Sequence, residues 1–289
     1  MTHRILSDSK VSRLIEEALL EDIGLGDITT EAIISSEAEG QADMLVKANG
    51  TIAGLEVAEL VFHYVDPRVT FVATIQDGTQ VSAGTVVAHI DGCAAGILKA
   101  ERTALNFVQR MSGIATLARK FVGQVAGTSA KITDTRKTAP GLRLLDKLAV
   151  QIGGGVNHRF GLDDMVLIKD NHIAAAGGIS PAIEKCLTYL RAINRKIKVE
   201  VETKNLDEIR EALIHDGVDR IMLDNFPIHE MRRAVEFING RVEVEASGNV
   251  SLNNVRQIAE TGVDFISIGA LTHSPSALDV SLEFRIPPS

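Results

Sequence analysis

In the second half of the chain, strand-like apolar runs alternate with helical runs at a nearly constant interval. Four of the strand-like runs end at Glu202, Asp224, Ser247 and Gly269, so successive ends lie 22 or 23 residues apart. An interval of this length accommodates one strand, one helix and their connections, and repeats of that unit build a parallel sheet. The pattern therefore predicts a parallel α/β sheet, either open or closed into a barrel.

Two further strand-like runs precede these four, so six strands are predicted. They span Lys131–Asp134, Met165–Lys169, Lys198–Glu202, Arg220–Asp224, Val242–Ser247 and Phe265–Gly269. Helical periodicity lies between the later strands, at Leu206–His215, His229–Ile238 and Leu252–Thr261. Because a complete barrel of this kind has eight strands, we expect an incomplete, irregular α/β barrel over residues 116–274.

The first half of the chain is predicted to be a separate domain rich in β-structure. Short alternating runs closed by Asn-Gly or Asp-Gly, typical of hairpins, lie between Ala42 and Gly92. The piece Asp77–Gly92 resembles the hammerhead of biotinyl and lipoyl carrier domains. A carrier role is not expected, because no lysine stands at a hairpin tip between such strands. Helices are predicted at Ser7–Leu20, Gly54–Tyr64 and Leu98–Val125, the last with a possible break at Gly113.

The end of the chain returns to strand periodicity. Leu278, Val280, Leu282 and Phe284 alternate with polar residues, which predicts a last strand that joins the N-terminal sheet. The first domain is thus expected to be an N-terminal α/β sandwich of residues 1–115 completed by the C-terminal tail, residues 275–289.

Composition restricts the classes of function. The net charge is −8, whereas a nucleic-acid binder usually carries a basic footprint, so nucleic acid is not an expected partner. Two cysteines are too few for a disulfide framework and favour a reducing compartment. No apolar run reaches membrane-spanning length, and the first residues do not resemble a signal peptide. We therefore expect a cytoplasmic protein without membrane contact.

A locally basic stretch, Thr133–Ile173, stands out in this acidic chain. It has two cation clusters, Arg136-Lys137 and His158-Arg159, with further cations at Arg143, Lys147 and Lys169. Between the clusters lie Pro140-Gly141 and the triple glycine at residues 153–155, so we expect these cations on turns and at a strand end, away from the polar face of any helix. Arginine forks grip carboxylate and phosphate groups in pairs, and glycine lets backbone N–H groups approach closely. The stretch predicts a site for a small polyanion.

Polar residues also mark the ends of the predicted strands. Lys169, Glu202, Asp224, Ser247-Gly248 and Gly269 all lie where a barrel collects its active-site loops. Any one of them could cap a helix or close a turn. Their joint placement on one rim favours an active site.

The chain resembles the quinolinate phosphoribosyltransferase family in seven segments that follow the family's order. These are ERTALNFVQRMSGIAT from Glu101, TDTRKTAPGLR from Thr133, GGGVNHRFGLDDMVLIKDNHI from Gly153, VEVET from Val199, IMLDNF from Ile221, EASGNV from Glu245 and ISIGALTHS from Ile266. The resemblance implies an N-terminal α/β sandwich, an incomplete α/β barrel and a homodimer with shared active sites. It also implies transfer of phosphoribosyl from phosphoribosyl pyrophosphate (PRPP) to quinolinate with loss of carbon dioxide, giving nicotinate mononucleotide for NAD biosynthesis.

The resemblance also assigns residues to the two substrates. Quinolinate would be bound by Arg102, reaching in from the neighbouring subunit, and by Thr135, Arg136, Lys137, His158 and Arg159. PRPP would be bound by Lys169, Glu202, Asp224, Ser247, Gly248, Asn249, Gly269 and Ala270. The implied catalytic residues are Lys137, Lys169, Glu202 and Asp224, and the implied cofactor is Mg²⁺, held near Glu202 and Asp224 directly or through substrate and water.

Three alternatives remain open from the sequence. One is a related enzyme that uses another aromatic acid, such as the homologues associated with molybdenum transport. Another is an unrelated barrel phosphate lyase, which normally needs a lysine poised for a Schiff base or proton transfer. The third is a non-catalytic binding module. The doubled cation clusters favour a dicarboxylate over a monocarboxylate, and analysis of the reaction products distinguishes all of these.

Overall fold

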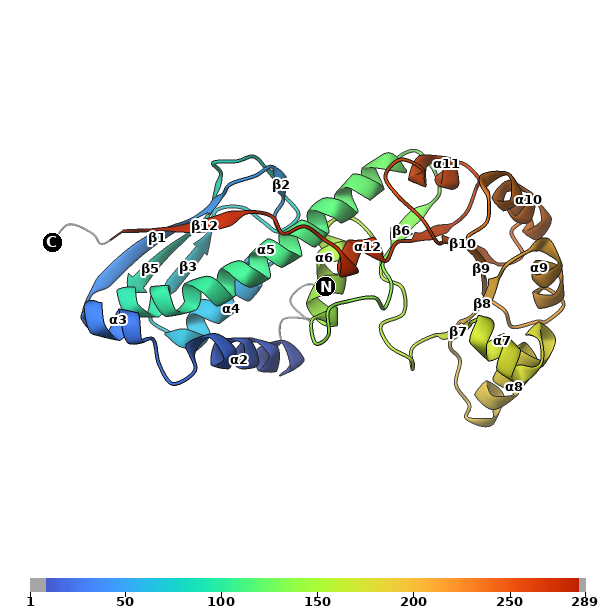
Figure 1. Ribbon diagram of the computed structural model, residues 1–289, viewed down its shortest axis with the longest axis horizontal. Helices are drawn as coiled ribbons and strands as arrows, with labels where there is room; N and C mark the ends of the chain where they lie inside the picture. The colour runs from blue at the N-terminus through green and yellow to red at the C-terminus, as the bar shows by residue number, and fades with distance from the viewer. Residues whose placement is uncertain (1–8, 286–289) are drawn as a thin grey trace. The chain divides into compact units, whose positions relative to one another are not determined.

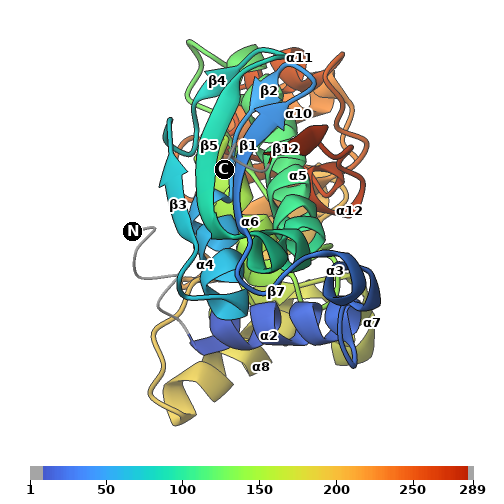
Figure 2. The same ribbon diagram turned by 90° about the vertical axis from the view of Figure 1, so that its left-hand side faces the viewer.

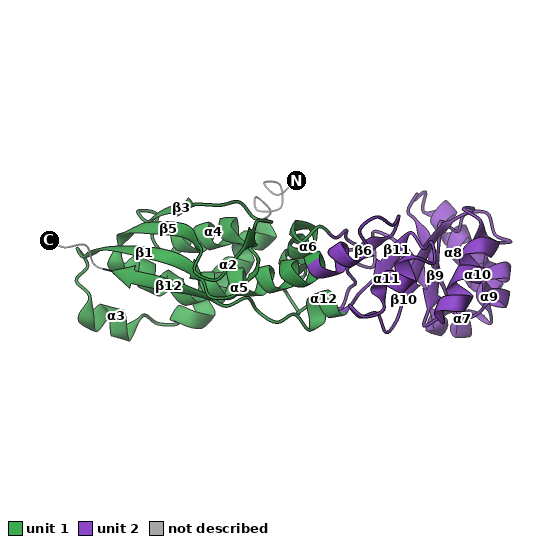
Figure 3. Ribbon diagram, turned by 90° about the horizontal axis from the view of Figure 1, so that it is seen from above, with its two compact units in different colours: residues 1–119, 138–154, 270–289 green, residues 120–137, 155–269 purple. Residues whose placement is uncertain are grey.

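The computed structural model describes residues 9–285, so the predicted helix start at Ser7 and the tail residues 286–289 lie outside the described residues. The described chain divides into two compact units (Figure 3). Unit 1 takes in residues up to 119, residues 138–154 and residues from 270 onwards, and unit 2 takes in residues 120–137 and 155–269. Residues 116–119, 138–154 and 270–274 thus group with unit 1, whereas the sequence had suggested the barrel for them.

Unit 1 is built on an antiparallel sheet in the order β12-β1-β5-β3 (Figures 1 and 2). Its strands are β1 (Glu39–Val46), β3 (Thr70–Ala73), β5 (Val86–Cys93) and β12 (Val280–Arg285), and a short pair is formed by β2 (Gly50–Thr51) and β4 (Gln80–Val81). The predicted tail strand is confirmed, because β12 pairs with β1 with Val280 opposite Val46. Alternate residues of β1, among them Ala42 and Met44, are buried, so one face of the sheet packs against the core.

The three helices predicted for unit 1, at Ser7–Leu20, Gly54–Tyr64 and Leu98–Val125, are present with bounds that differ by a few residues, and three further helices were not predicted. They are α2 (Ser9–Ile23), α3 (Ile28–Ile33), α4 (Leu55–Val65), α5 (Ala94–Gln124), α6 (Arg143–Ile152) and α12 (Ala270–His273), with the last residues of α5 in unit 2. Helix α5 passes through Gly113 without a break. A Cβ atom at Gly113 would lie 2.1 Å from the carbonyl oxygen of Ser276, so this glycine lets the segment that leads to β12 cross the helix closely.

Unit 2 contains the predicted parallel sheet of six strands, in the order β6-β11-β10-β9-β8-β7. The strands are β6 (Lys131–Thr133), β7 (Val166–Ile168), β8 (Val199–Thr203), β9 (Arg220–Asp224), β10 (Glu243–Ser247) and β11 (Phe265–Ser267). Strands β6 and β7 are the edges of the sheet, and within residues 9–285 no strand joins them to close the barrel. The expectation of an incomplete α/β barrel is confirmed.

The two faces of this sheet differ in chemistry. One face carries apolar side chains such as Val201, Ile221 and Ala246, which are fully buried. Figure 1 shows helices α9 and α10 on the outer side of β8 and β9. The helices of unit 2 are α7 (Asp170–Ala176), α8 (Ile179–Ala192), α9 (Leu206–Ala212), α10 (Ile228–Ile238) and α11 (Val255–Ala259).

The other face of the sheet carries charged and polar side chains at the alternate positions. Glu200 stands in register with Arg220, Arg220 with Glu243, and Ser247 with Ser267. Parallel strands covered on both faces usually read as continuous apolar runs, so the alternation marks an inner face built for a polar ligand. Among the described residues, no helix is both long enough and apolar enough to span a membrane.

Candidate active site

A cavity of about 350 Å³ opens on the inner face of the unit 2 sheet, towards the carboxyl ends of the strands. It is lined by Thr135, Arg136, Lys137, His158, Arg159, Leu167, Lys169, Met222, Glu245, Ser247 and Ser267. The structure therefore brings together both predicted cation clusters, Lys169 and one of the predicted strand-end residues, Ser247. All of them belong to unit 2.

One wall of the cavity is basic. Arg136 and Lys137 follow β6, and the hydroxyl of Thr135 accepts the backbone N–H of Lys137 at 3.0 Å. The guanidinium of Arg159 donates to the carbonyl of Met165 at 3.1 Å. Partial burial, together with the positive charge of Arg136, lowers the pKa of Arg159. Two guanidinium groups that repel each other in one cavity are stabilised by an anion placed between them.

The rim beside β7 and β8 holds an ion pair. Lys169 Nζ lies 2.8 Å from Glu202 Oε2, with the Glu202 side chain only 10% exposed and the Lys169 side chain 45% exposed. Lys169 is placed by the start of α7, where its backbone N–H donates to His172 Nδ1 at 3.0 Å. The lysine can therefore turn to a bound anion while its stem stays fixed.

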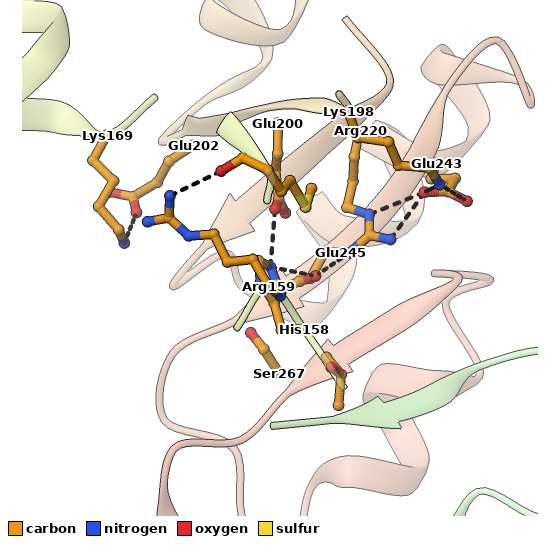
Figure 4. Close-up of polar contacts among 12 residues, drawn as sticks. His158, Arg159, Lys169, Lys198, Glu200, Glu202, Arg220, Glu243, Glu245 and Ser267 are labelled. Carbon is orange, nitrogen blue, oxygen red and sulfur yellow. Dashed lines mark hydrogen bonds and ion pairs between the residues drawn. The ribbon is translucent and has the colours of Figure 1, made fainter. Parts of the chain in front are cut away.

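Below the rim lies a group of charges that we call the charged floor: His158, Glu200, Arg220, Glu243 and Glu245 (Figure 4). His158 Nε2 lies 2.9 Å from Glu200 Oε2 and 3.4 Å from Glu245 Oε2. Arg220 bonds to Glu245 at 2.9 Å and to Glu243 at 2.9 and 3.1 Å. The side chains of Glu200 and Glu245 are fully buried, and the Arg220 side chain is 9% exposed.

The pKa values of the two buried carboxyl groups, Glu200 and Glu245, are shifted in opposite directions. Burial and the charge of Glu245 raise the pKa of Glu200. Burial acts the same way on Glu245, but His158 and Arg220 outweigh it and lower the pKa of Glu245. Glu245 is therefore the ionised member, and Glu200 is the first to take a proton as the pH falls. The Oε1 atoms of both are buried without a hydrogen-bond partner among the described residues.

The ring of His158 makes hydrogen bonds to other protein groups. Burial alone would lower its pKa, but Glu200 and Glu245 raise the pKa of His158 to about 9. Its Nδ1 accepts the backbone N–H of Arg159 at 2.7 Å, so a second proton at Nδ1 requires this contact to open. With a single proton, on Nε2, the ring holds both the carboxylates and the loop that carries Arg159; with two protons, the form that the raised pKa favours near neutral pH, the ring keeps the Nε2 contacts and loses the one at Nδ1.

The charged floor also has the composition of a metal site. The ligand atoms of His158, Glu200 and Glu245 lie within 4.8 Å of one another. The guanidinium of Arg220 already supplies positive charge at this point, and it stacks over the ring of Phe265 at 3.9 Å. We therefore interpret the cluster as an ion-pair network that supports the cavity.

The loops after β9 and β10 form another part of the rim. Asp224 ends β9, and its Oδ1 accepts a bond from Asn225 Nδ2 at 3.1 Å. Gly248 and Asn249, which follow β10, have the left-handed φ values of +95° and +50°. Gly269 lies just beyond β11. The predicted strand-end residues of unit 2 are thus where the sequence placed them.

Four other cations or predicted site residues lie in unit 1. Arg102 is exposed on α5, and Ala270 begins α12. Arg143 and Lys147, which the sequence placed on the turns of the basic stretch, are instead part of α6, and Lys147 is 2% exposed. That interpretation was wrong because RLLDKLAVQI has helical periodicity, which buries Leu145, Leu148 and Ala149.

Sequence reasoning missed the four members of the charged floor that lie on strands, namely Glu200, Arg220, Glu243 and Glu245. The signal was present in VEVET and EVEAS, where acidic residues alternate with buried apolar residues inside parallel strands. Such alternation requires one face of the sheet to be polar, and it would have placed Glu200 beside Glu202 on that face.

Comparison with known proteins agrees with this architecture. The family model for the N-terminal domain of quinolinate phosphoribosyl transferase matches residues 27–112, and the model for its C-terminal domain matches residues 114–283. Among solved structures, the nicotinate-nucleotide pyrophosphorylase from Francisella tularensis superimposes with a TM-score of 0.89 at 40% identity, covering 96% of each chain.

Curated relatives match this chain along nearly its whole length. A quinolinate phosphoribosyltransferase (decarboxylating) of Nicotiana tabacum is 48% identical over 94% of this chain and 82% of its own length. A probable nicotinate-nucleotide pyrophosphorylase (carboxylating) of Synechocystis is 45% identical over 93% of this chain and 90% of its own length. With both domain models matched and this level of identity along the chain, the protein belongs to the quinolinate phosphoribosyltransferase family.

Proposed function

We propose that this protein transfers the phosphoribosyl group of PRPP to the ring nitrogen of quinolinate and releases pyrophosphate and carbon dioxide. The product is nicotinate mononucleotide, a precursor of NAD. The observation that carries the proposal is the convergence of Arg136, Lys137, Arg159 and Lys169 on one cavity of about 350 Å³ in a chain whose net charge is −8. The second support is the membership of this protein in the quinolinate phosphoribosyltransferase family.

The basic wall is the proposed quinolinate side of the cavity. Quinolinate carries two adjacent carboxylates, and Arg136 and Arg159 are cations that repel each other until an anion separates them. Lys137 and the hydroxyl of Thr135 complete this wall. In this account His158 acts mainly on the position of Arg159, because its Nε2 is bonded to Glu200 and its Nδ1 faces the backbone N–H of Arg159.

The rim is the proposed PRPP side. Lys169 would leave Glu202 in part to meet phosphate oxygens, and Glu202 and Asp224 would accept bonds from the ribose hydroxyls. Gly248, Asn249 and Gly269 offer backbone N–H groups on the loops after β10 and β11, and Ser247 offers its hydroxyl at the end of β10. The ends of barrel strands are a usual place for a phosphate. Ala270 follows Gly269 directly in the chain.

Mg²⁺ is the proposed cofactor, and it would neutralise the charge of the leaving pyrophosphate. Glu202 and Asp224 offer oxygen ligands of the right kind, but Glu202 is paired with Lys169 and Asp224 Oδ1 is bonded to Asn225. A hard cation takes at least six oxygens, so these residues fit as a partial shell. The rest would come from the substrate and water.

Catalysis in this proposal depends on placement and charge. Departure of pyrophosphate leaves a cationic ribose carbon, which the cavity holds next to the quinolinate nitrogen. After transfer, the C–C bond to the carboxylate beside the cationic ring nitrogen breaks and carbon dioxide leaves; the electron pair stays on the ring carbon, where the adjacent positive nitrogen stabilises it, and a proton from water then replaces the lost group. The protein supplies orientation and fixed charges through Lys137, Lys169, Glu202 and Asp224, and no protein nucleophile is required.

We further propose that the active protein is a homodimer in which Arg102 completes the quinolinate side of the partner's cavity. The support is the exposure of this arginine on α5, together with the family resemblance. A cytoplasmic location is also proposed, from the two cysteines, neither of which is in a disulfide.

Product analysis tests the proposed reaction. The protein is incubated with PRPP, Mg²⁺ and either quinolinate or nicotinate, and the nucleotide, pyrophosphate and carbon dioxide are quantified. Quinolinate should give nicotinate mononucleotide, pyrophosphate and carbon dioxide in equal amounts. A nucleotide that keeps both carboxylates, or formation of product without carbon dioxide, would contradict the proposal.

A further inference from the structure

The loops after β9 and β10 are tied together by one side chain, that of Asn225. Its Nδ2 donates to Asp224 Oδ1 at 3.1 Å, and its Oδ1 accepts from Asn249 Nδ2 at 2.9 Å. Its backbone N–H donates to the carbonyl of Ser247 at 2.9 Å. Both ends of the amide and the main chain of this residue therefore connect one strand end to the next.

The backbone at this point is arranged to let the amide reach across. Asn225 has a φ of +56°, a left-handed conformation that asparagine adopts more readily than most residues. A Cβ atom at Gly248 would lie 2.2 Å from Asn225 Oδ1, and Gly248 has a φ of +95°. The amide of Asn225 thus occupies the space that any side chain at position 248 would need.

The second loop is also held from its far side. Asn249 has a φ of +50°, and its carbonyl accepts from Asn254 Nδ2 at 2.9 Å. The Oδ1 of Asn254 in turn accepts the backbone N–H of Ser251 at 2.7 Å. The loop therefore has a defined shape of its own, and Asn225 is the residue that fixes this shape relative to the carboxylate of Asp224.

We propose that Asn225 is a positioning residue for the PRPP side of the site. It orients the Asp224 carboxylate and holds residues 247–249 at a set distance from it, so that ribose hydroxyls and phosphate are recognised by one rigid unit. The inference rests on the proposed function, which assigns Asp224 and these loop residues to PRPP. Asn225 itself is not required to touch the substrate.

The substitution Asn225→Asp isolates this role. Aspartate also tolerates the left-handed conformation and keeps the Oδ1 acceptor for Asn249. It loses the Nδ2 donor and places a second carboxylate against Asp224, which turns a bond into a repulsion. The matched control is Asn239→Asp, at the C-terminal end of α10, where the asparagine has a φ of +48° and is exposed.

Calorimetric titration of PRPP and of quinolinate measures each side of the site without turnover. Loss of a charge-assisted hydrogen bond predicts a Kd for PRPP raised by about tenfold or more in Asn225→Asp. The Kd for quinolinate should stay within about twofold of wild type, and Asn239→Asp should leave both unchanged. Asn225→Gly keeps the backbone conformation, removes the side chain and should raise the Kd for PRPP in the same selective way.

The results separate this inference from the proposed reaction. Two results would show that Asn225 does not position the PRPP side. One is that both Asn225 variants bind PRPP as tightly as Asn239→Asp does. The other is that the Kd values for PRPP and for quinolinate rise by the same factor. A selective loss of PRPP binding supports the inference. Wild-type protein that binds PRPP but makes no nicotinate mononucleotide would contradict the reaction instead, and the binding comparison would still decide the role of Asn225.

Discussion

Replacing Arg220 by methionine tests whether the charged floor supports the cavity. Methionine keeps most of the length and apolar stem of arginine but has no charge. In Arg220→Met, Glu245 loses its bond of 2.9 Å while remaining fully buried, and Glu243 loses two bonds. The stacking of Arg220 over Phe265 is lost as well.

The burial of these side chains predicts a large loss of unfolding free energy in Arg220→Met. Removing one partner of a buried ion pair costs up to about 3–5 kcal/mol of unfolding free energy, because Glu245 stays buried and keeps only the longer contact of 3.4 Å with His158. For a unit of this size, that corresponds to a fall in melting temperature of roughly 6–20 °C. The control is Lys198→Met, since Lys198 bonds the same Glu243 but is 52% exposed. Breaking an exposed pair should cost less than about 1 kcal/mol.

The assay is urea unfolding of both variants and wild type at several pH values. The pKa of Glu245 is lowered in the folded protein, so the stability it contributes is present above its ordinary value of 4.5 and is lost as the pH falls through the folded pKa. Without Arg220, the carboxyl takes a proton more readily, and a neutral Glu245 needs no partner. The deficit of Arg220→Met should therefore be largest near pH 7 and shrink as the pH approaches 4.

Two results would refute this reasoning. One is an Arg220→Met variant whose unfolding free energy lies within about 1 kcal/mol of that of Lys198→Met at pH 7. The other is a deficit that does not change between pH 7 and pH 4. Either would mean that the cluster is hydrated or rearranges easily, and that its ion pairs do not set the shape of the cavity floor.

The other predictions concern the proposed reaction. Activity should vanish with a chelator and return with Mg²⁺ or Mn²⁺ in a steady-state assay, and full activity in chelator would remove the metal from Glu202 and Asp224. Arg159→Ala should weaken quinolinate binding by about 2–5 kcal/mol and Lys169→Ala should act mainly on PRPP, as titration calorimetry would measure; swapped effects would reverse the two sides. Mixing inactive Arg102→Ala and Lys169→Ala homodimers after dissociation should restore about a quarter of wild-type activity, because half the dimers are mixed and each has one intact site. A mixture that stays inactive, although heterodimers are shown to form, would place Arg102 in the site of its own chain.

Much of the fold of unit 2 followed from periodicity. Strand β9 was predicted at its observed bounds, Arg220–Asp224, because apolar and charged residues change abruptly at both ends. Helix α11 was predicted over Leu252–Thr261 but is formed only by Val255–Ala259. There Asn254 bonds the backbone of Ser251 and the carbonyl of Asn249, which uses the preceding residues in a loop.

The residues of the candidate site that lie at the strand ends were predictable from the sequence, and those of the charged floor were not. Lys169 and Asp224 stand where parallel strands deliver residues to a common edge, so order along the chain was sufficient. The pairing of Arg220 with Glu245 depends on strand register and on which face each residue occupies, and neither can be obtained from spacing alone. The bonds of His158 depend on the path of an irregular loop, which periodicity does not describe.

The central claim is that the cavity is built for a dicarboxylate. Its most direct test is the ratio of two kcat/KM values, that for quinolinate and that for nicotinate, both measured with PRPP on one preparation of the protein. Nicotinate lacks the carboxylate that would satisfy the second guanidinium of the Arg136 and Arg159 pair. Losing one hydrogen bond between a guanidinium and a carboxylate predicts that quinolinate is favoured by at least about tenfold and up to about a hundredfold. Equal use of the two acids would contradict the account.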